Sequence, residues 1–148
     1  MTDIKITGAN LIEQIRTYFP ELERSYQEQA PELEDEGGKL SNYLFIGNVF
    51  KPMVEEELES GKITPVLERC AAFIERVCID DDLEAVNAIW IRIFEWLIFR
   101  PTELHTIWPI LGTATKANIR DAARRWSEAG RYYGKTANLP EANIPDRE

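Results

Sequence analysis

The amino-acid sequence predicts an all-α fold, a single-domain antiparallel helical bundle around a central helix at about residues 81–100. Three observations indicate this fold class. Apolar residues recur at helical spacing through most of the chain, no segment alternates polar and apolar residues long enough to indicate a strand, and the 44% hydrophobic content suits a folded core. The arrangement would also suit HEAT-like helix pairs. We expect this domain to cover residues 1–134 and a loosely ordered C-terminal tail to follow at 135–148.

The central helix is the most apolar segment of the sequence. We expect Asp81 to cap its N-terminus, with Glu84 three positions later, and the helix to end at Arg100 before a proline. Its inner sector would consist of Val86, Asn87, Ile89, Trp90, Ile93, Phe94 and Leu97. The strip left for solvent would consist of Glu84, Ala88, Arg92, Glu95 and Phe99. A helix that is apolar around most of its circumference is normally buried.

The N-terminal part is expected to contain two shorter helices. The first would begin after a cap at Thr7 or Asn10, carry a regular apolar stripe and stop at Pro20. The same proline can start a short second helix, Glu21–Gln29. An acidic loop that ends in two glycines follows at residues 30–38.

A third main helix is expected to follow this loop and to run to Ser60, where Gly61 stops it. The stretch before it, residues 40–46, can be helical or extended. Gly47-Asn48 indicates a break and a new N-cap. Pro52 must lie in the first turn of the helix or kink it, and the sequence leaves both arrangements open.

Three more helices are expected around the central one. Thr64 followed by Pro65 is a strong start signal for the helix that precedes it. Thr102 can cap a short helix that runs through Trp108. The last helix would run from about residue 114 to 129, with Ala117, Ala122 and Trp126 on its packed side and Gly130 at its end.

The two cysteines, Cys70 and Cys78, fall on the same predicted helix. Eight residues along a helix separate them by about 12 Å, which is too far for a disulfide. They are therefore expected to be reduced thiols in or beside the core. No apolar signal region follows Met1, so we expect a cytoplasmic protein.

The net charge of −9 is concentrated in one quarter of the chain. Residues 21–60 carry eleven acidic side chains and three basic ones. Such a field disfavours direct binding to nucleic acid or to an anionic membrane, and it favours a basic protein as the partner. The chain could act as a monomer or as a homodimer.

No catalytic, cofactor or metal site is expected. His105 is the single histidine, and no serine, cysteine or carboxylate motif accompanies it. The run Asp80-Asp81-Asp82 lacks the glycine and the final glutamate of an EF-hand loop, so helix capping explains it better. The residues themselves predict no reaction.

Four segments together resemble a known family: YFPELE at 18–23, YLFIGNVFKPMVEEEL at 43–58, DDDLEAVNAIWIRIFEWL at 80–97 and WPILGTATK at 108–116. Their order and spacing resemble a family of small, acidic, all-helical bacterial proteins of unknown function. Members are similar to the immunity proteins of polymorphic or contact-dependent toxin systems. The resemblance implies no catalytic residues.

We therefore expect an immunity or antitoxin-like protein that binds and neutralises a cognate toxin, or another basic protein, through an acidic surface. The residues expected to bind the partner are Glu32, Glu34, Asp35, Glu36, Glu55, Glu56, Glu57, Glu59 and Tyr43. Tyr132 and Tyr133 are alternative aromatic anchors to Tyr43. The alternatives are a DNA-mimicking inhibitor or another acidic interaction adaptor, with an enzyme ranked below both.

Overall fold

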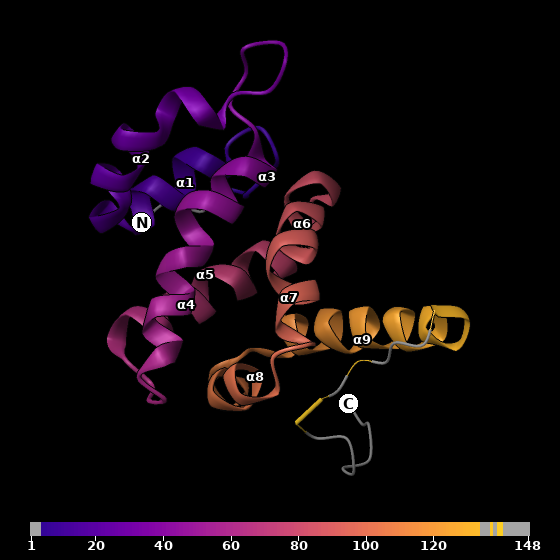
Figure 1. The fold of residues 1–148 in the computed structure, drawn as a ribbon. Helices are drawn as coiled ribbons and strands as arrows, with labels where there is room; N and C mark the ends of the chain where they lie inside the picture. The colour runs from indigo at the N-terminus through magenta and orange to yellow at the C-terminus, as the bar shows by residue number, and fades with distance from the viewer. Residues whose placement is uncertain (1–3, 134–136, 138, 141–148) are drawn as a thin grey trace.

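The computed structural model describes residues 4–133 together with 137, 139 and 140 (Figure 1). All regular secondary structure in this part of the chain is helical, and an isolated bridge joins Glu34 to Leu40. The all-α prediction is confirmed. The elements of the N-terminal half are α1 (Leu11–Tyr18), the 3₁₀ helix η1 (Pro20–Leu22), α2 (Glu23–Gln29), the 3₁₀ helix η2 (Ala30–Leu33), α3 (Asn42–Phe45), the π-helical η3 (Ile46–Phe50) and α4 (Lys51–Glu59). Those of the C-terminal half are α5 (Pro65–Asp80), α6 (Leu83–Ile89), the π-helical η4 (Trp90–Phe94), α7 (Glu95–Leu97), α8 (Pro101–Ile107), the 3₁₀ helix η5 (Trp108–Ile110) and α9 (Thr113–Tyr133).

The elements α3, η3 and α4 form one continuous helix. Ser41 caps it by accepting a hydrogen bond from the Leu44 amide at 3.2 Å. The break and N-cap predicted at Gly47-Asn48 are therefore wrong. Pro52 has no amide hydrogen, and its ring would crowd a regular α-helical turn. The wider π-helical turn immediately before it accommodates the ring without ending the helix.

The central helix is built from α6, η4 and α7, and it begins one residue later than predicted. Asp81 is not its N-cap but the C-cap residue that follows the preceding helix α5, in a left-handed conformation with φ of 57°. Asp82 caps α6 instead by accepting a hydrogen bond from the Ala85 amide at 3.2 Å. Glu84 is consequently not at the predicted capping-box position. Three consecutive aspartates can each cap a helix, so the sequence does not decide among them.

The solvent-facing strip of the central helix differs from the predicted one. Asn87 and Ile91 are exposed, whereas Ala88 is fully buried. The large inner residues Ile89, Ile93 and Phe94 are buried as predicted. The small side chains on α6 face neighbouring helices, since α6 packs against both α3 and α5. Small size at a close helix contact, rather than apolar character, places Ala88 inside.

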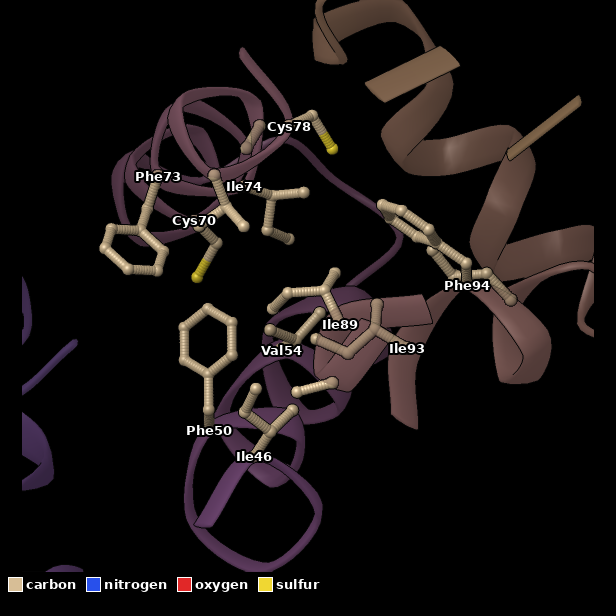
Figure 2. Packing of buried hydrophobic residues seen from close by; sticks show 14 of the residues in the cluster. Ile46, Phe50, Val54, Cys70, Phe73, Ile74, Cys78, Ile89, Ile93 and Phe94 are labelled. Atoms are coloured by element: carbon tan, nitrogen blue, oxygen red, sulfur yellow. The ribbon is translucent and has the colours of Figure 1, made fainter. Parts of the chain in front are cut away.

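The core lies where α4, α5 and the central helix meet. Figure 2 shows Phe50 and Phe73 facing one another across it, with Ile89 and Ile93 on the third side. The ring centroids of Phe50 and Phe73 are 6.1 Å apart, and Phe19 lies 5.3 Å from Phe50. This aromatic cluster joins α1, η3 and α5 in one continuous apolar interior.

Cys70 and Cys78 are free and buried in this interior, which confirms the prediction that they are reduced core thiols (Figure 2). Burial raises the pKa of each thiol to about 12. Both are therefore protonated at neutral pH and unreactive in the folded protein.

The last helix, α9, is longer than predicted, and its N-terminus is capped by a side chain of another helix, α5. It continues through Gly130, which is buried, so close packing there offsets the low helix propensity of glycine. At its first turn the Glu75 carboxylate of α5 accepts hydrogen bonds from the amides of Ala114 (3.1 Å) and Thr115 (2.8 Å) and from the Thr115 hydroxyl (2.7 Å). A Cβ at Gly112 would overlap that carboxylate, so only glycine allows the close approach. Ala117, expected on the packed side, is exposed.

The central helix ends at Leu97, three residues before the predicted end at Arg100, and the remaining predicted boundaries hold to within a residue or two. Thr64 caps α5 through a 3.1 Å hydrogen bond from the Leu67 amide, as expected. The helix expected to start after Thr102 begins at Pro101 instead. Most of the predicted tail, 135–148, lies outside the described residues, and its Ala137 and Leu139 are partly buried against the core.

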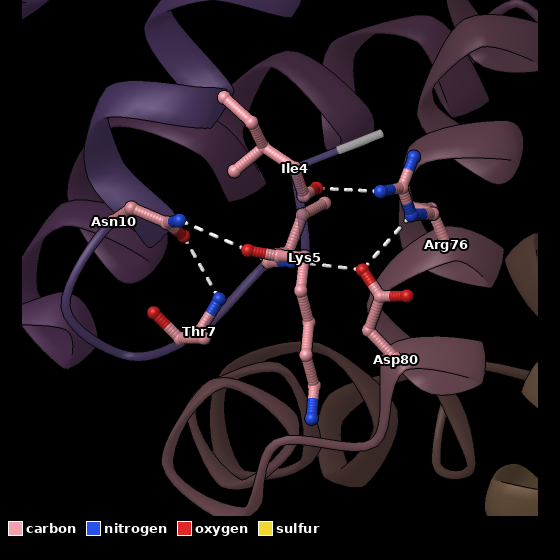
Figure 3. Close-up of polar contacts among 7 residues, drawn as sticks. Ile4, Lys5, Thr7, Asn10, Arg76 and Asp80 are labelled. Atoms are coloured by element: carbon pink, nitrogen blue, oxygen red, sulfur yellow. Dashed lines mark hydrogen bonds and ion pairs between the residues drawn. The ribbon is translucent and has the colours of Figure 1, made fainter. Parts of the chain in front are cut away.

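The N-terminal arm is fastened to the corner between α5 and α6, and Figure 3 shows its contacts with Arg76 and Asp80. The amide of Ile6 donates to the Asp80 carboxylate at 2.8 Å, and the amide of Gly8 donates to the Asp82 carboxylate at the same distance. Arg76 bridges the Asp80 carboxylate and the Ile4 carbonyl. The aspartate run therefore anchors a distant segment as well as capping helices.

The hydrogen bonds to Asp82 predict a measurable pH dependence of stability. Donation from the Gly8 and Ala85 amides lowers the pKa of the Asp82 carboxyl below its ordinary value of 3.8. The contribution is therefore fully present well above pH 3.8 and is lost as pH falls through the lower pKa of the folded state. Asp82→Asn should flatten the acid limb of the stability curve, measured by urea unfolding between neutral and acidic pH. The control is Asp81→Asn, a change at an exposed neighbour, which should leave the acid limb unchanged. Equal acid limbs in wild type, Asp82→Asn and Asp81→Asn would contradict the stabilising role of the Asp82 carboxylate.

Candidate functional site: a charged aromatic hollow beside two π-helical segments

The two π-helical segments, η3 and η4, pack against each other. Single π-helical turns within α-helices are uncommon and occur frequently at functional sites. Here they belong to two helices that run side by side in the same direction (Figure 1). The contact between the two segments is therefore a candidate functional site.

Arg92 fixes the register of the two helices. Its Nε donates a 3.0 Å hydrogen bond to the carbonyl of Tyr43, and its guanidinium lies against the backbone at Gly47. A Cβ at position 47 would overlap the guanidinium, which explains a glycine inside the apolar run of this helix. One turn further along, Lys51 lies with its Nζ 4.9 Å from the ring centroid of Trp96.

A hollow of about 590 Å³ opens beside this contact. Its lining residues are Lys51, Ile91, Arg92, Glu95, Trp96, Phe99 and Trp126. They come from α4, from the second half of the central helix, from the turn that follows it and from α9. The rings of Phe99 and Trp126 meet edge to face with centroids 5.3 Å apart. The volume is within the usual range of small-molecule sites, roughly 300–1,000 Å³.

Three charged groups line the hollow without an ion pair among the described residues: Lys51, Arg92 and Glu95. Lys51 stacks on the Trp96 ring, and Arg92 donates a hydrogen bond to the backbone carbonyl of Tyr43. Glu95 is half-buried, and no hydrogen bond within residues 4–133 engages its carboxylate. The lining thus carries a net charge of +1 in a chain of net charge −9.

Comparison with known proteins assigns the chain to a family. The model of DUF7674, a domain of unknown function, matches residues 12–127. The chain belongs to the DUF7674 family. No curated protein and no solved structure matches it. All residues that line the hollow lie inside the DUF7674 domain, whereas the N-terminal arm lies outside it. The family description names no activity, so the resemblance to immunity proteins stays a prediction.

The structure of the DUF7674 domain divides the eight predicted acidic residues into two groups. The loop group, Glu32, Glu34, Asp35 and Glu36, precedes α3, and the helix group, Glu55, Glu56, Glu57 and Glu59, ends α4. The continuous helix between them is about 25 Å long, and the groups lie toward its opposite ends (Figure 1). The single acidic surface expected from the sequence is therefore two surfaces.

These eight acids share a property that the other three acids of residues 21–60 lack. Glu21 pairs with Arg69, Glu23 with Arg16 and Glu28 with Arg24. The hydrogen bond from Arg69 lowers the pKa of the Glu21 carboxyl, and the bond from Arg16 lowers that of Glu23. Among the described residues, none of the eight forms an ion pair.

Two of the eight have structural contacts of their own. The Glu57 carboxylate accepts a hydrogen bond from the hydroxyl of Thr64, the residue that caps α5. The Asp35 carboxylate accepts the amides of Gly37 and Lys39 and so holds the acidic loop in its turn. The remaining six carboxylates are the ones with no such contact in the described part of the chain.

Tyr43, the predicted aromatic anchor, belongs to neither acidic group and lies in α3. Tyr43 is 38% exposed, and its backbone carbonyl accepts a hydrogen bond from Arg92, which lines the hollow. The side chains of Tyr132 and Tyr133, the alternative anchors, lie outside the described residues. His105 is exposed, as expected of a surface histidine. Within the described residues there is no metal-binding cluster and no helix long and apolar enough to cross a membrane.

Sequence reasoning missed the hollow. Its residues lie in three separate segments of the sequence. Taken singly, each is of an ordinary kind, because Lys51 can be a surface lysine and Trp126 a packed aromatic. Two signals were nevertheless in the sequence. Gly47 inside an apolar run and Pro52 soon after it are residues that regular helices avoid, and together they indicate a distorted helix.

Proposed function

We propose that this DUF7674 protein binds a basic protein partner through its two groups of unpaired carboxylates and, in line with the family resemblance, blocks it as an immunity protein blocks a toxin. The single observation that supports this proposal most strongly is the absence of ion pairs at all eight predicted residues within the described structure, while their neighbours Glu21, Glu23 and Glu28 are paired.

Clustered like charges oppose folding slightly, because each close pair on a helix costs a few tenths of a kcal/mol. A partner with positive charge would remove this repulsion and would be attracted from a distance. Two groups separated by about 25 Å would fall within one interface of ordinary size, which covers about 800 Å² on each partner. The same separation disfavours the DNA-mimic alternative, which needs carboxylates along one continuous face.

The test is a pair of charge reversals at exposed residues without structural contacts. Glu56→Lys with Glu59→Lys changes the helix group, and Glu32→Lys with Glu36→Lys changes the loop group. Each should lower the association rate with the purified partner about tenfold or more at low salt, and the effect should shrink as salt is added. Dissociation rates should change less. Stopped-flow or surface-based kinetics gives both rates.

The matched control is Glu13→Lys with Glu68→Lys, which makes the same charge change at exposed sites on α1 and α5. If the control slows association as much as the other two variants, the effect is one of net charge and the two proposed surfaces are wrong. Co-expression with the partner then tests the inhibitory part of the proposal, because wild type should suppress the partner's activity and the combined four-residue variant should not.

A further inference from the structure

The charges that line the hollow follow a fixed order along it. Arg92 of the central helix contacts Tyr43 and Gly47 of the continuous α3–α4 helix. Lys51 of the α3–α4 helix contacts Trp96 of the central helix. Residue numbers rise in the same direction along both helices, from 43 to 51 on one and from 92 to 96 on the other, so the two helices are parallel. The two cations therefore lie about one helical turn apart along the hollow. Glu95, between Arg92 and Trp96 in sequence, lines the same hollow.

This arrangement has two cations, one carboxylate and an aromatic wall. A purely cationic ligand would face Lys51 and Arg92, and a purely anionic ligand would leave the half-buried Glu95 carboxylate unmatched. A ligand that carries a carboxylate and an ammonium group on neighbouring atoms satisfies all three. An apolar body attached to it would cover the exposed edges of Phe99 and Trp126.

We propose that the hollow binds a free α-amino acid with an apolar side chain. Its carboxylate lies at Lys51 and Arg92, its ammonium group at Glu95, and its side chain against Phe99 and Trp126. The C-terminal residue of a polypeptide has the same carboxylate and side chain but an amide in place of the ammonium group. The free amino acid is favoured because a half-buried carboxylate such as Glu95 is stabilised more by a cation than by an amide. This site is separate from the acidic surfaces proposed above.

The test uses the full-length protein and a ligand series built on L-phenylalanine. Isothermal titration calorimetry, with tryptophan fluorescence as a second signal, should show saturable binding of L-phenylalanine. Phenethylamine lacks the carboxylate, 3-phenylpropionate lacks the ammonium group and N-acetyl-L-phenylalanine mimics a chain end. Each should bind about tenfold or more weakly, because each loses a charge-assisted contact.

Variants assign each contact through the ratio of the affinities of one protein for two ligands of the series. A general loss of folding would lower both affinities and leave their ratio unchanged. Glu95→Gln should abolish the preference for L-phenylalanine over 3-phenylpropionate. Lys51→Met should abolish the preference for L-phenylalanine over phenethylamine. Lys62→Met, an exposed lysine outside the hollow, should preserve both preferences. Gly47→Ala removes no charge but displaces the Arg92 guanidinium, and it should weaken binding of L-phenylalanine and 3-phenylpropionate together.

Three results would overturn the proposal. If no ligand of the series saturates at about 10 mM, which corresponds to negligible affinity, the hollow is not an amino-acid site. Equal binding of all four ligands would mean that the aromatic wall alone is recognised. Tighter binding of N-acetyl-L-phenylalanine than of the free amino acid would assign the hollow to a polypeptide chain end instead.

Discussion

Replacing Glu75 by alanine is expected to lower the free energy of unfolding by about 3 kcal/mol, because a carboxylate that accepts several hydrogen bonds at a buried helix start is lost. The three bonds run to the amides of Ala114 and Thr115 and to the Thr115 hydroxyl. Thr115 is 0% exposed, so its amide and its hydroxyl lose a hydrogen-bond acceptor at a buried position. The carboxylate also opposes the positive end of the α9 dipole.

Urea unfolding followed by circular dichroism measures this loss. Glu75→Gln keeps one acceptor oxygen and should cost roughly half as much as Glu75→Ala. Glu68→Ala is the matched control, because Glu68 is exposed on the same helix and should change stability by no more than about 0.5 kcal/mol. Equal midpoints for Glu75→Ala and Glu68→Ala would show that α9 does not depend on this cap.

Phe50→Ala should destabilise the protein by about 4 kcal/mol, because it removes a fully enclosed ring and leaves a cavity among rigid neighbours. Phe50 is 0% exposed and contacts Phe19 and Phe73, with ring centroids 5.3 Å and 6.1 Å away. The substitution lies in η3, next to Lys51, so the π-helical turn should loosen as well.

Phe99→Ala is the comparison for Phe50→Ala. Phe99 is 37% exposed and packs against Trp126 at the hollow, so its loss should cost less than about 1.5 kcal/mol. Thermal and urea unfolding of the two variants should therefore differ clearly. Equal costs would mean that Phe50 is not at the centre of the core.

The helical class and several boundaries could be predicted because they depend on local chemistry. Thr64 before Pro65 is a start signal whatever surrounds it, and the apolar spacing of α5 predicts its buried face. The two cysteines could be interpreted from helix geometry alone. The choice among Asp80, Asp81 and Asp82 could not, because it depends on where α5 ends and on the N-terminal arm, which arrives from 74 residues away.

The candidate sites also contain features that local sequence predicts and features that depend on distant contacts. The charge count of residues 21–60 predicts unpaired carboxylates there, because eleven acidic side chains outnumber three basic ones, whereas binding of a partner by the eight acids stays a prediction. It could not show that Glu57 and Asp35 hold structural hydrogen bonds, nor that the long α3–α4 helix separates the acids into two groups. The hollow depends on π-helical turns, which no simple periodicity of 3.6 residues anticipates.

The cap that Glu75 provides for α9 also has a consequence for the order of folding. The first turn of α9 takes its acceptor from a residue 39 or 40 positions earlier, so a peptide that contains α9 alone has a frayed start. During synthesis α5 leaves the ribosome well before α9. We therefore expect the nascent chain to form its aromatic interior first and to add α9 last, onto a carboxylate that is already in place.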